Sequence, residues 1–237
     1  AATLMADGII TPPISVSSAI EGLGGVKAFE DLIEPGNNLT VGVVIGIISM
    51  LFFFQRFGTK VVGFAFGPFI LVWFSMLLVL GLVQVVHYPH VLQCLNPYHA
   101  YKLLVEYEGG FWILGAVFLC TTGAEALYSD LGHCGRKNIQ ASWGFVKAAL
   151  ILNYMGQGAW ILSHGGTYLQ GVNPFYELMP PWFLVLGVMI ATAAAIIASQ
   201  ALISGSFTLI SEAIQLNFWP RVRVKFPTEV RGQIYIP

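Results

Sequence analysis

Residues 115–132, GAVFLCTTGAEALYSDLG, place the carboxylate of Glu125 directly behind a run of apolar side chains. An ionised group inside lipid is costly, so an acidic residue in a membrane-spanning segment usually faces a polar cavity and marks an ion or proton pathway. Asp7 and Glu21 repeat this pattern in the first apolar stretch of the chain. No basic residue lies beside these three carboxylates, which indicates a protein that handles cations inside a membrane.

The composition of the whole chain also indicates a membrane setting. Of the 237 residues, 56% are hydrophobic and only 10% are charged, and the mean hydropathy is +0.74. A soluble domain has about 25% charged residues, so this chain has too few for a surface that faces water. The net charge is -1, and the sequence contains no run of basic residues, which argues against a nucleic-acid partner.

The three cysteines, Cys94, Cys120 and Cys134, lack the spacing of a zinc site or of a disulfide framework. Nor do His87 and His90 form a helical metal pair, because Pro89 lies between them. We therefore expect no cofactor, and no metal other than a transported ion.

Six stretches approach the length of about 20 mostly apolar residues that a helix needs to cross the hydrocarbon core. They are residues 1–24, 39–54, 61–86, 109–129, 139–163 and 182–210. We predict an all-α polytopic membrane protein with a single transmembrane domain over residues 1–237. Turn residues predict loops between the stretches, in IEPGNN, YPHVLQCLNPYH, GHCGRKN and GVNPFYELMPP. The segment TLISEAIQL, at the end of the sixth stretch, has the pattern of an amphipathic helix that leaves the membrane.

Two further patterns concern packing and the chain ends. Glycines four residues apart, Gly42 with Gly46 and Gly63 with Gly67, predict close helix contacts. The chain starts at Ala1 without a charged segment, so no signal peptide is expected. It ends on IYIP, which leads into another element, and we expect it to be part of a longer protein.

The positive charges predict the orientation, because loops rich in lysine and arginine stay in the cytoplasm. Basic residues follow the second, fourth and sixth stretches: Arg56, Lys60, Arg136, Lys137, Arg221, Arg223, Lys225 and Arg231. The loops at residues 55–60, 130–138 and 211–237 are therefore expected in the cytoplasm of a multi-pass protein of the cell membrane. Lys147 is the one basic residue inside a predicted span. Its amine either extends to the cytoplasmic interface, which we favour, or neutralises an interior carboxylate.

A stripe of oxygen-bearing side chains follows one side of the first stretch. Asp7, Thr11, Ser15, Ser18 and Glu21 lie within an arc of about 120° on a helical wheel. Hard cations need several oxygen ligands to replace their lost water. Pro12 and Pro13 cannot donate to the carbonyls of Gly8 and Ile9, which leaves these oxygens available to an ion.

A plainer interpretation is that such hydroxyls bond their own backbone or a neighbouring helix. We favour it for Ser17 and Ser18, and we favour an ion site for Asp7, Thr11 and Ser15. In the fourth stretch, Thr122 and Glu125 also share a helix face. Gly123 between them marks a place where the helix can unwind, as the discontinuous helices of secondary transporters do.

The motifs ADGIITPPISVSSAIEGL, TGAEALY, LNYMGQGAW, IIASQALISGSFTL and GQIYIP resemble the Kup/HAK/KT family of potassium uptake transporters along the whole chain. The resemblance implies a partial inverted-repeat fold of the LeuT/APC type, covering transmembrane helices three to eight, and symport of potassium with protons across the bacterial cytoplasmic membrane. It implies the potassium ligands Asp7, Thr11, Ser15, Thr122 and Glu125, with proton coupling at Glu21 and Glu125. The family's first-helix motif is absent here, so the site is expected to be incomplete. Lys147 stands where the family pattern leads us to expect an apolar residue.

The expected partners are potassium, protons, the lipid bilayer and a second copy of the chain in a homodimer. Three alternatives stay open at this point. The same fold carries amino acids or other small solutes in some transporters, and paired intramembrane acids also occur in aspartyl proteases, although the motifs of such an enzyme are missing. A purely structural subunit would leave the buried acids unexplained.

Overall fold

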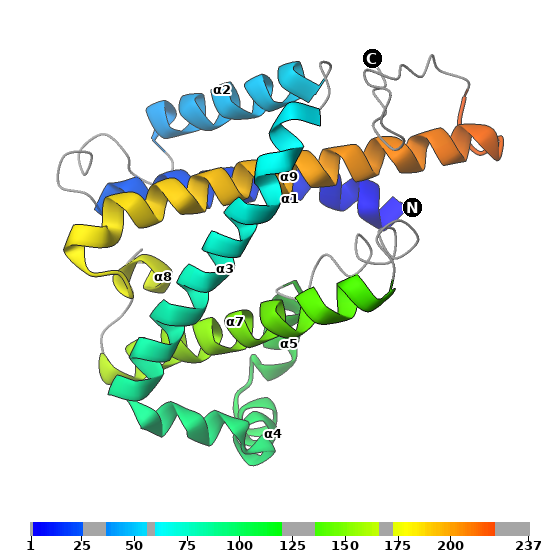
Figure 1. The fold of residues 1–237 in the computed structure, drawn as a ribbon. Coiled ribbons are helices and arrows are strands. Elements are labelled where there is room, and N and C mark those ends of the chain that lie inside the picture. Colours follow the sequence, from blue (N-terminus) through cyan, green and yellow to red (C-terminus); the bar gives the residue numbers. More distant parts are fainter. Residues whose placement is uncertain (1, 26–36, 56–59, 120–135, 166–172, 221–237) are drawn as a thin grey trace. The chain divides into compact units, whose positions relative to one another are not determined.

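The computed structural model describes residues 2–25, 37–55, 60–119, 136–165 and 173–220. For residues 2–8, 21, 23, 25, 54–55, 60–65 and 118–119 it describes the backbone alone. Within these ranges the chain forms helices joined by short turns and contains no strand (Figure 1). The prediction of an all-α protein is confirmed.

Helices occupy the described parts of all six predicted apolar stretches; residues 120–129 of the fourth lie outside the described residues. The elements are α1 (Ala2–Glu21), the 3₁₀ helix η1 (Gly22–Gly25), α2 (Asn38–Gln55), α3 (Lys60–His87), the 3₁₀ helix η2 (Pro89–Leu95), α4 (Pro97–Glu106), α5 (Gly110–Leu119), α7 (Arg136–Ser163), α8 (Pro174–Glu177) and α9 (Pro181–Gln215). Among the described residues, Phe66–His87 and Pro181–Gln215 are long and apolar enough to cross a membrane, judged by length and composition. Ile9–Ile20 and Asn38–Phe53 are shorter apolar helices. The count of six spans and the single transmembrane domain stay predictions.

The segment YPHVLQCLNPYH was predicted as a loop, and this prediction is wrong. Residues from Pro89 to Glu106 form η2 and α4. Asn96 starts α4, because its side-chain oxygen accepts a hydrogen bond from the backbone N–H of Tyr98 at 3.1 Å and Pro97 occupies the first turn. Asn173 and Pro174 begin the short helix α8 in the same way, inside a second predicted loop. Local capping thus makes helices where the turn residues suggested none.

The boundaries of all three predicted cytoplasmic loops also need correction. Gln55 ends α2 and Lys60 begins α3, so the first loop is limited to residues 56–59. Helix α9 continues without interruption to Gln215, so residues 211–215 are part of it and do not form a separate amphipathic helix. Asn217, with φ of 58°, adopts the left-handed conformation that commonly follows a helix end. At the second loop, α7 already begins at Arg136.

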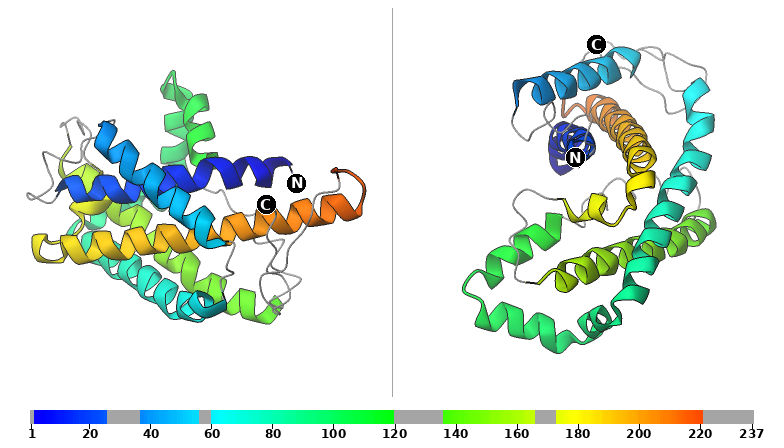
Figure 2. Two further views of the ribbon diagram at one scale, coloured as in Figure 1. Left: turned by 90° about the horizontal axis from the view of Figure 1, so that it is seen from above. Right: turned by 90° about the vertical axis from the view of Figure 1, so that its left-hand side faces the viewer.

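The chain divides into two compact units, and each is described by itself. The first comprises Ala1–Trp73 with Met179–Pro237. Within it, α1 packs against both α2 and α9, and α1 and α9 run in opposite directions (Figures 1 and 2). Val16, Ile20 and Val44 form a buried cluster between α1 and α2, to which Ile47 and Ile48 add their side chains.

In the second unit, Phe74–Leu178, α7 contacts η2 and also meets α3 at Val85 and Gly81. Val85, Val91 and Ala159 form its buried cluster, with Tyr88 and Met155 packed against it.

Gly81 of α3 and Gly156 of α7 allow the two helix backbones of this unit to touch. A methyl group added at Gly156 would lie 2.7 Å from the Cα of Gly81, and one added at Gly81 would meet the backbone of Leu152 and lie 2.6 Å from the amide nitrogen of Asn153. Small residues permit this close approach between helices in a membrane. Neither glycine belonged to the spacing from which close packing was predicted.

Among the described residues, the predicted contacts of Gly42, Gly46 and Gly67 are not found, and the surroundings of Gly63 lie outside the described part. A methyl group at Gly42, Gly46 or Gly67 would meet no atom within 4 Å. All three glycines lie on exposed faces of their helices. Spacing on one helix shows that glycines share a face, but it does not show whether a neighbour covers that face.

We expect Gly81→Ala to destabilise the full-length protein, because the new methyl group would overlap backbone atoms that cannot rotate away. Overpacking of this kind costs about 1–3 kcal/mol. Thermal unfolding in detergent should show a clearly lower midpoint. The matched control is Gly42→Ala, which adds the same group to open space and should leave the midpoint unchanged or slightly higher; equal midpoints for both variants would contradict the close crossing.

Candidate functional site

Helix α1 carries the predicted oxygen stripe at the border of its packed face. Thr11 and Ser15 are half-buried. On one side of them lie the buried Pro12 and Val16, and on the other lies Ile14, which is 62% exposed. The two hydroxyl-bearing residues are one helical turn apart and therefore share a face. Side chains at this border can contact a packed neighbouring helix and can also face the open space beside it.

Two prolines lie inside α1, and the helix nevertheless runs from Ala2 to Glu21. Neither Pro12 nor Pro13 has a backbone N–H, so neither can bond the carbonyl four residues earlier. Pro12 is among the most completely buried residues, which fixes this part of α1 against its neighbours. That the carbonyls of Gly8 and Ile9 face an ion stays a prediction.

The structure places only part of the predicted ligand set. Thr11 and Ser15 lie together on α1. The backbone of Asp7 and Glu21 belongs to the same helix, but their side chains lie outside the described part. Thr122, Gly123 and Glu125 also lie outside the described residues. The full set of potassium and proton ligands is therefore a prediction for these positions.

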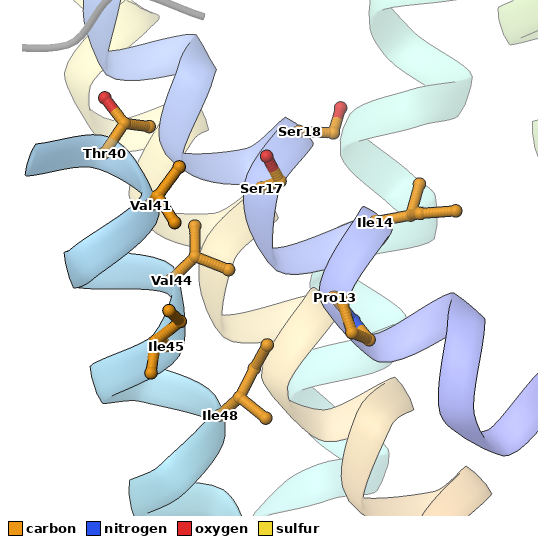
Figure 3. Close-up of a pocket in the computed structure, with 9 residues that line it drawn as sticks. All are labelled: Pro13, Ile14, Ser17, Ser18, Thr40, Val41, Val44, Ile45 and Ile48. Carbon is orange, nitrogen blue, oxygen red and sulfur yellow. The ribbon is translucent and has the colours of Figure 1, made fainter. Parts of the chain in front are cut away.

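A groove of about 580 Å³ lies between α1 and α2 (Figure 3). Its walls are mainly apolar, and Ser17, Ser18 and Thr40 contribute hydroxyl-bearing side chains. The lining residues are Pro13, Ile14, Ser17, Ser18, Thr40, Val41, Val44, Ile45 and Ile48. Neither Thr11 nor Ser15 is among them, and mainly apolar walls cannot replace the water around a small cation. This groove is distinct from the predicted cation site.

Hydroxyl groups on α9 bond the backbone of their own helix, which was the plainer interpretation of such residues. They donate to carbonyls one turn earlier in their own helix: Thr192 to Val188 at 2.8 Å, Ser199 to Ala195 at 2.7 Å, Ser206 to Leu202 at 3.0 Å and Thr208 to Ser204 at 3.1 Å. Such bonds satisfy the hydroxyl without a partner helix. These residues are therefore not assigned to an ion site.

Gln200 of α9 is a structural residue that the sequence analysis missed. Its side chain is 7% exposed, and its Nε2 donates to the backbone carbonyl of Leu51 in α2 at 3.1 Å. Its Oε1 is buried and has no hydrogen-bond partner in the described part of the chain. A single amide in an apolar helix was the available signal, because such a group is expensive to bury without a partner.

Asn153 and Gln157 of α7 were expected either to line a cavity or to bridge helices. Gln157 Nε2 donates to Asn153 Oδ1 at 2.6 Å within the same helix. Asn153 is 4% exposed and lies beside the close crossing of α3 and α7. Among the described residues the pair bonds along one helix and not across two.

The remaining titratable candidates lie on exposed surfaces. Lys147 is exposed, and its Nζ lies 5.8 Å from the centre of the Trp143 ring. His87 pairs through Nδ1 with the carbonyl of Val83 at 2.7 Å. Within the described ranges no three residues of the metal-binding types form a group.

Apolar helices of membrane-spanning length are typical of the class of integral membrane proteins. The family model described as "K+ potassium transporter integral membrane domain" matches residues 1–237. The chain belongs to this family of membrane transporters, which confirms the resemblance seen in the motifs. The family consists of transporters and not of enzymes.

Several curated proteins are similar to the chain. A "Probable potassium transport system protein Kup" of Flavobacterium johnsoniae is 58% identical over 99% of this chain and 36% of its own length. Proteins of the same name from Cytophaga hutchinsonii and Clostridium perfringens are 59% and 51% identical, over 100% and 99% of this chain and 35% and 36% of theirs. The chain thus spans about a third of the length of these relatives. No solved structure matches it.

We expect Gln200→Met to weaken the attachment of α9 to α2 with little change in side-chain volume. The loss of one interhelical hydrogen bond should lower the free energy of unfolding by about 0.5–1.5 kcal/mol, as measured by the unfolding midpoint of the full-length protein. Ser206→Ala removes a bond within one helix and serves as the control. An unchanged midpoint for Gln200→Met would show that the bond to Leu51 contributes nothing net.

Proposed function

We propose that the full-length protein takes up potassium across the bacterial cytoplasmic membrane as a potassium–proton symporter. The observation that carries the proposal is the family match over residues 1–237, together with relatives that are named as potassium transport proteins. That naming favours potassium over the amino acids or other small solutes considered as an alternative. The half-buried hydroxyl stripe of Thr11 and Ser15 supports a cation as the cargo.

The proposed potassium site uses Asp7, Thr11 and Ser15 of α1 with Thr122 and Glu125 of the segment after α5. Carboxylates balance the charge of the ion, and hydroxyl oxygens complete its shell in place of water. Two separate segments of the chain supply these oxygens, so the site can assemble or open as the segments shift. The full-length protein supplies further groups, since this chain covers about a third of its relatives.

The proposed proton carriers are Glu21 and Glu125. A carboxyl in a poorly hydrated site exchanges its proton with whichever side of the membrane it faces, and its charge then changes its affinity for a cation nearby. Proton entry and potassium entry are coupled when one carboxyl takes part in both. Glu125 fits this double role because it is proposed as a ligand as well.

The proposed architecture is a partial LeuT/APC-type fold with six membrane spans. Arg56 after α2, Arg136 and Lys137 at the start of α7, and the basic residues after α9 support a cytoplasmic position for residues 56–59, 130–135 and 216–237. The remaining connections face outward in this arrangement. A homodimer is proposed as the assembly.

We expect Glu125→Gln in the full-length protein to abolish potassium uptake, because the amide is nearly the same size but neither balances the ion's charge nor carries the proton. Uptake is measured at low external potassium, at acidic and at neutral pH, in a bacterium that lacks its own potassium transporters. Glu177→Gln, at an exposed position, is the matched control. Normal uptake by Glu125→Gln with normal expression would refute the assignment.

We expect Thr11→Ala and Ser15→Ala each to raise the KM for potassium by roughly tenfold, since hydrogen-bonding or ligand groups next to a charge contribute about 1.5–3 kcal/mol and part of this is recovered by water. The maximum rate should change less. Ser206→Ala removes a hydroxyl that already bonds its own helix and should leave the KM unchanged. A KM that is unaffected in both α1 variants would remove these hydroxyls from the site.

A further inference from the structure

Helix α7 presents a row of cationic, polar and aromatic side chains on one exposed face. Arg136, Gln140, Trp143 and Lys147 follow one another at intervals of four, three and four residues. On a helix this spacing keeps them within about 60° of one another. All four are exposed. We call this row the α7 stripe.

The α7 stripe lies opposite the face by which α7 packs. The buried residues of α7 are Ala149, Asn153, Gly156 and Ala159, and the helical wheel places them roughly half a turn away from the stripe. Farther along the stripe's own side, Ile151 and Tyr154 are each 53% exposed. The exposed face therefore begins with cations at its start and continues as an apolar surface.

Within the α7 stripe, the side chains of Lys147 and Trp143 lie close to each other. Its Nζ lies 5.8 Å from the centre of the Trp143 ring, one helical turn nearer the start of α7. This distance is within the range of a cation–π contact. No carboxylate in the described part of the chain forms a salt bridge with the Lys147 amine. Residues 136–163 include no acidic residue, and the described part of the chain holds one salt bridge, between Lys102 and Glu106.

The length of the lysine side chain fits a position just below a membrane surface. Lys147 lies about 12 Å along the helix from residue 139, where the apolar stretch begins. A lysine in this position extends its amine toward the headgroup layer. Tryptophan rings prefer that layer too. Trp143 and the Lys147 amine thus lie at one level, and Arg136 lies farther out.

We propose that the α7 stripe binds the phosphate group of an anionic phospholipid. The positive charges of Arg136 and Lys147 are complementary to the phosphate, Gln140 offers a hydrogen bond to the headgroup, and the surface of Ile151 and Tyr154 accommodates an acyl chain. Basic clusters beside apolar helix surfaces are the usual sites of such lipids. The family model of an integral membrane domain includes the residues of α7, and a membrane lipid is therefore the anion proposed for this face.

The proposal explains why a charged residue is tolerated at position 147, inside a predicted membrane span. It does not depend on potassium or proton transport and goes beyond them. A different assignment, in which Lys147 neutralises a carboxylate inside the transport path, makes opposite predictions for the same variants.

The test measures thermal unfolding of the purified full-length protein in detergent, with phosphatidylglycerol or phosphatidylcholine of the same acyl chains added. Phosphatidylglycerol should raise the unfolding midpoint more than phosphatidylcholine does. Titration should show about fivefold weaker binding in each of Arg136→Gln and Lys147→Gln, as expected for the loss of one cation near the surface. Lys147→Arg should keep most of the effect.

Lys137→Gln is the matched control, because Lys137 is an exposed cation that lies about 100° away from Arg136 on the helix. It should bind phosphatidylglycerol as the unchanged protein does. Equal binding by Lys147→Gln and the unchanged protein would overturn the proposal. So would an equal stabilisation by soluble glycerol phosphate, which would identify a free-anion site.

Potassium uptake distinguishes this proposal from the proposed function. If Lys147→Gln loses uptake but keeps its response to phosphatidylglycerol, the lysine serves the transport path and the lipid site is refuted. Glu125→Gln should keep the full lipid response whatever its uptake. In Glu125→Gln, a loss of uptake with an unchanged lipid response therefore supports the proposed function and has no bearing on the lipid site.

Discussion

The absence of water around a membrane helix is the constraint on which the rest of this structure depends. Every backbone N–H and C=O in the hydrocarbon layer needs a partner inside the protein, and a helix provides most of them within one segment. The hydroxyls of α9 obey the same rule by returning to carbonyls of their own helix. Gln200 is buried across the α2–α9 contact and satisfies its amide donor on the carbonyl of Leu51. Polar groups that break the pattern are thus the ones to examine for function.

Hydropathy predicted the positions of the long helices well, because a run of about 20 apolar residues has few other outcomes in a membrane. The helices between α3 and α5 were missed for a physical reason. Their residues are mixed in polarity, and α4 depends on the cap formed by Asn96 and Pro97, a local hydrogen bond that loop composition conceals. The end of α9 was missed because a polar residue, Glu212, is tolerated in a helix that continues past the apolar stretch.

For the candidate site, the sequence gives the angular position of a residue on its helix but not the identity of the neighbour. The shared face of Thr11 and Ser15 could be predicted, and so could the helix that holds Asp7. The same reasoning failed for Gly42 and Gly46, which meet nothing, and overlooked Gly81 and Gly156, which meet each other. Two glycines on different helices have no spacing that the sequence can show. The partner of a helix face is decided by packing, which depends on residues far away in the chain.

The crossing at Gly81 and Gly156 has a mechanical consequence. Where side chains separate two helices, small rotamer changes let one helix slide or tilt against the other. Here backbone lies against backbone, and the nearest atoms have no torsion of their own with which to adjust. We therefore expect the ends of α3 and α7 that meet there to move together as a single rigid strut. A transporter that changes shape during its cycle must place its hinges elsewhere and carry this strut along whole.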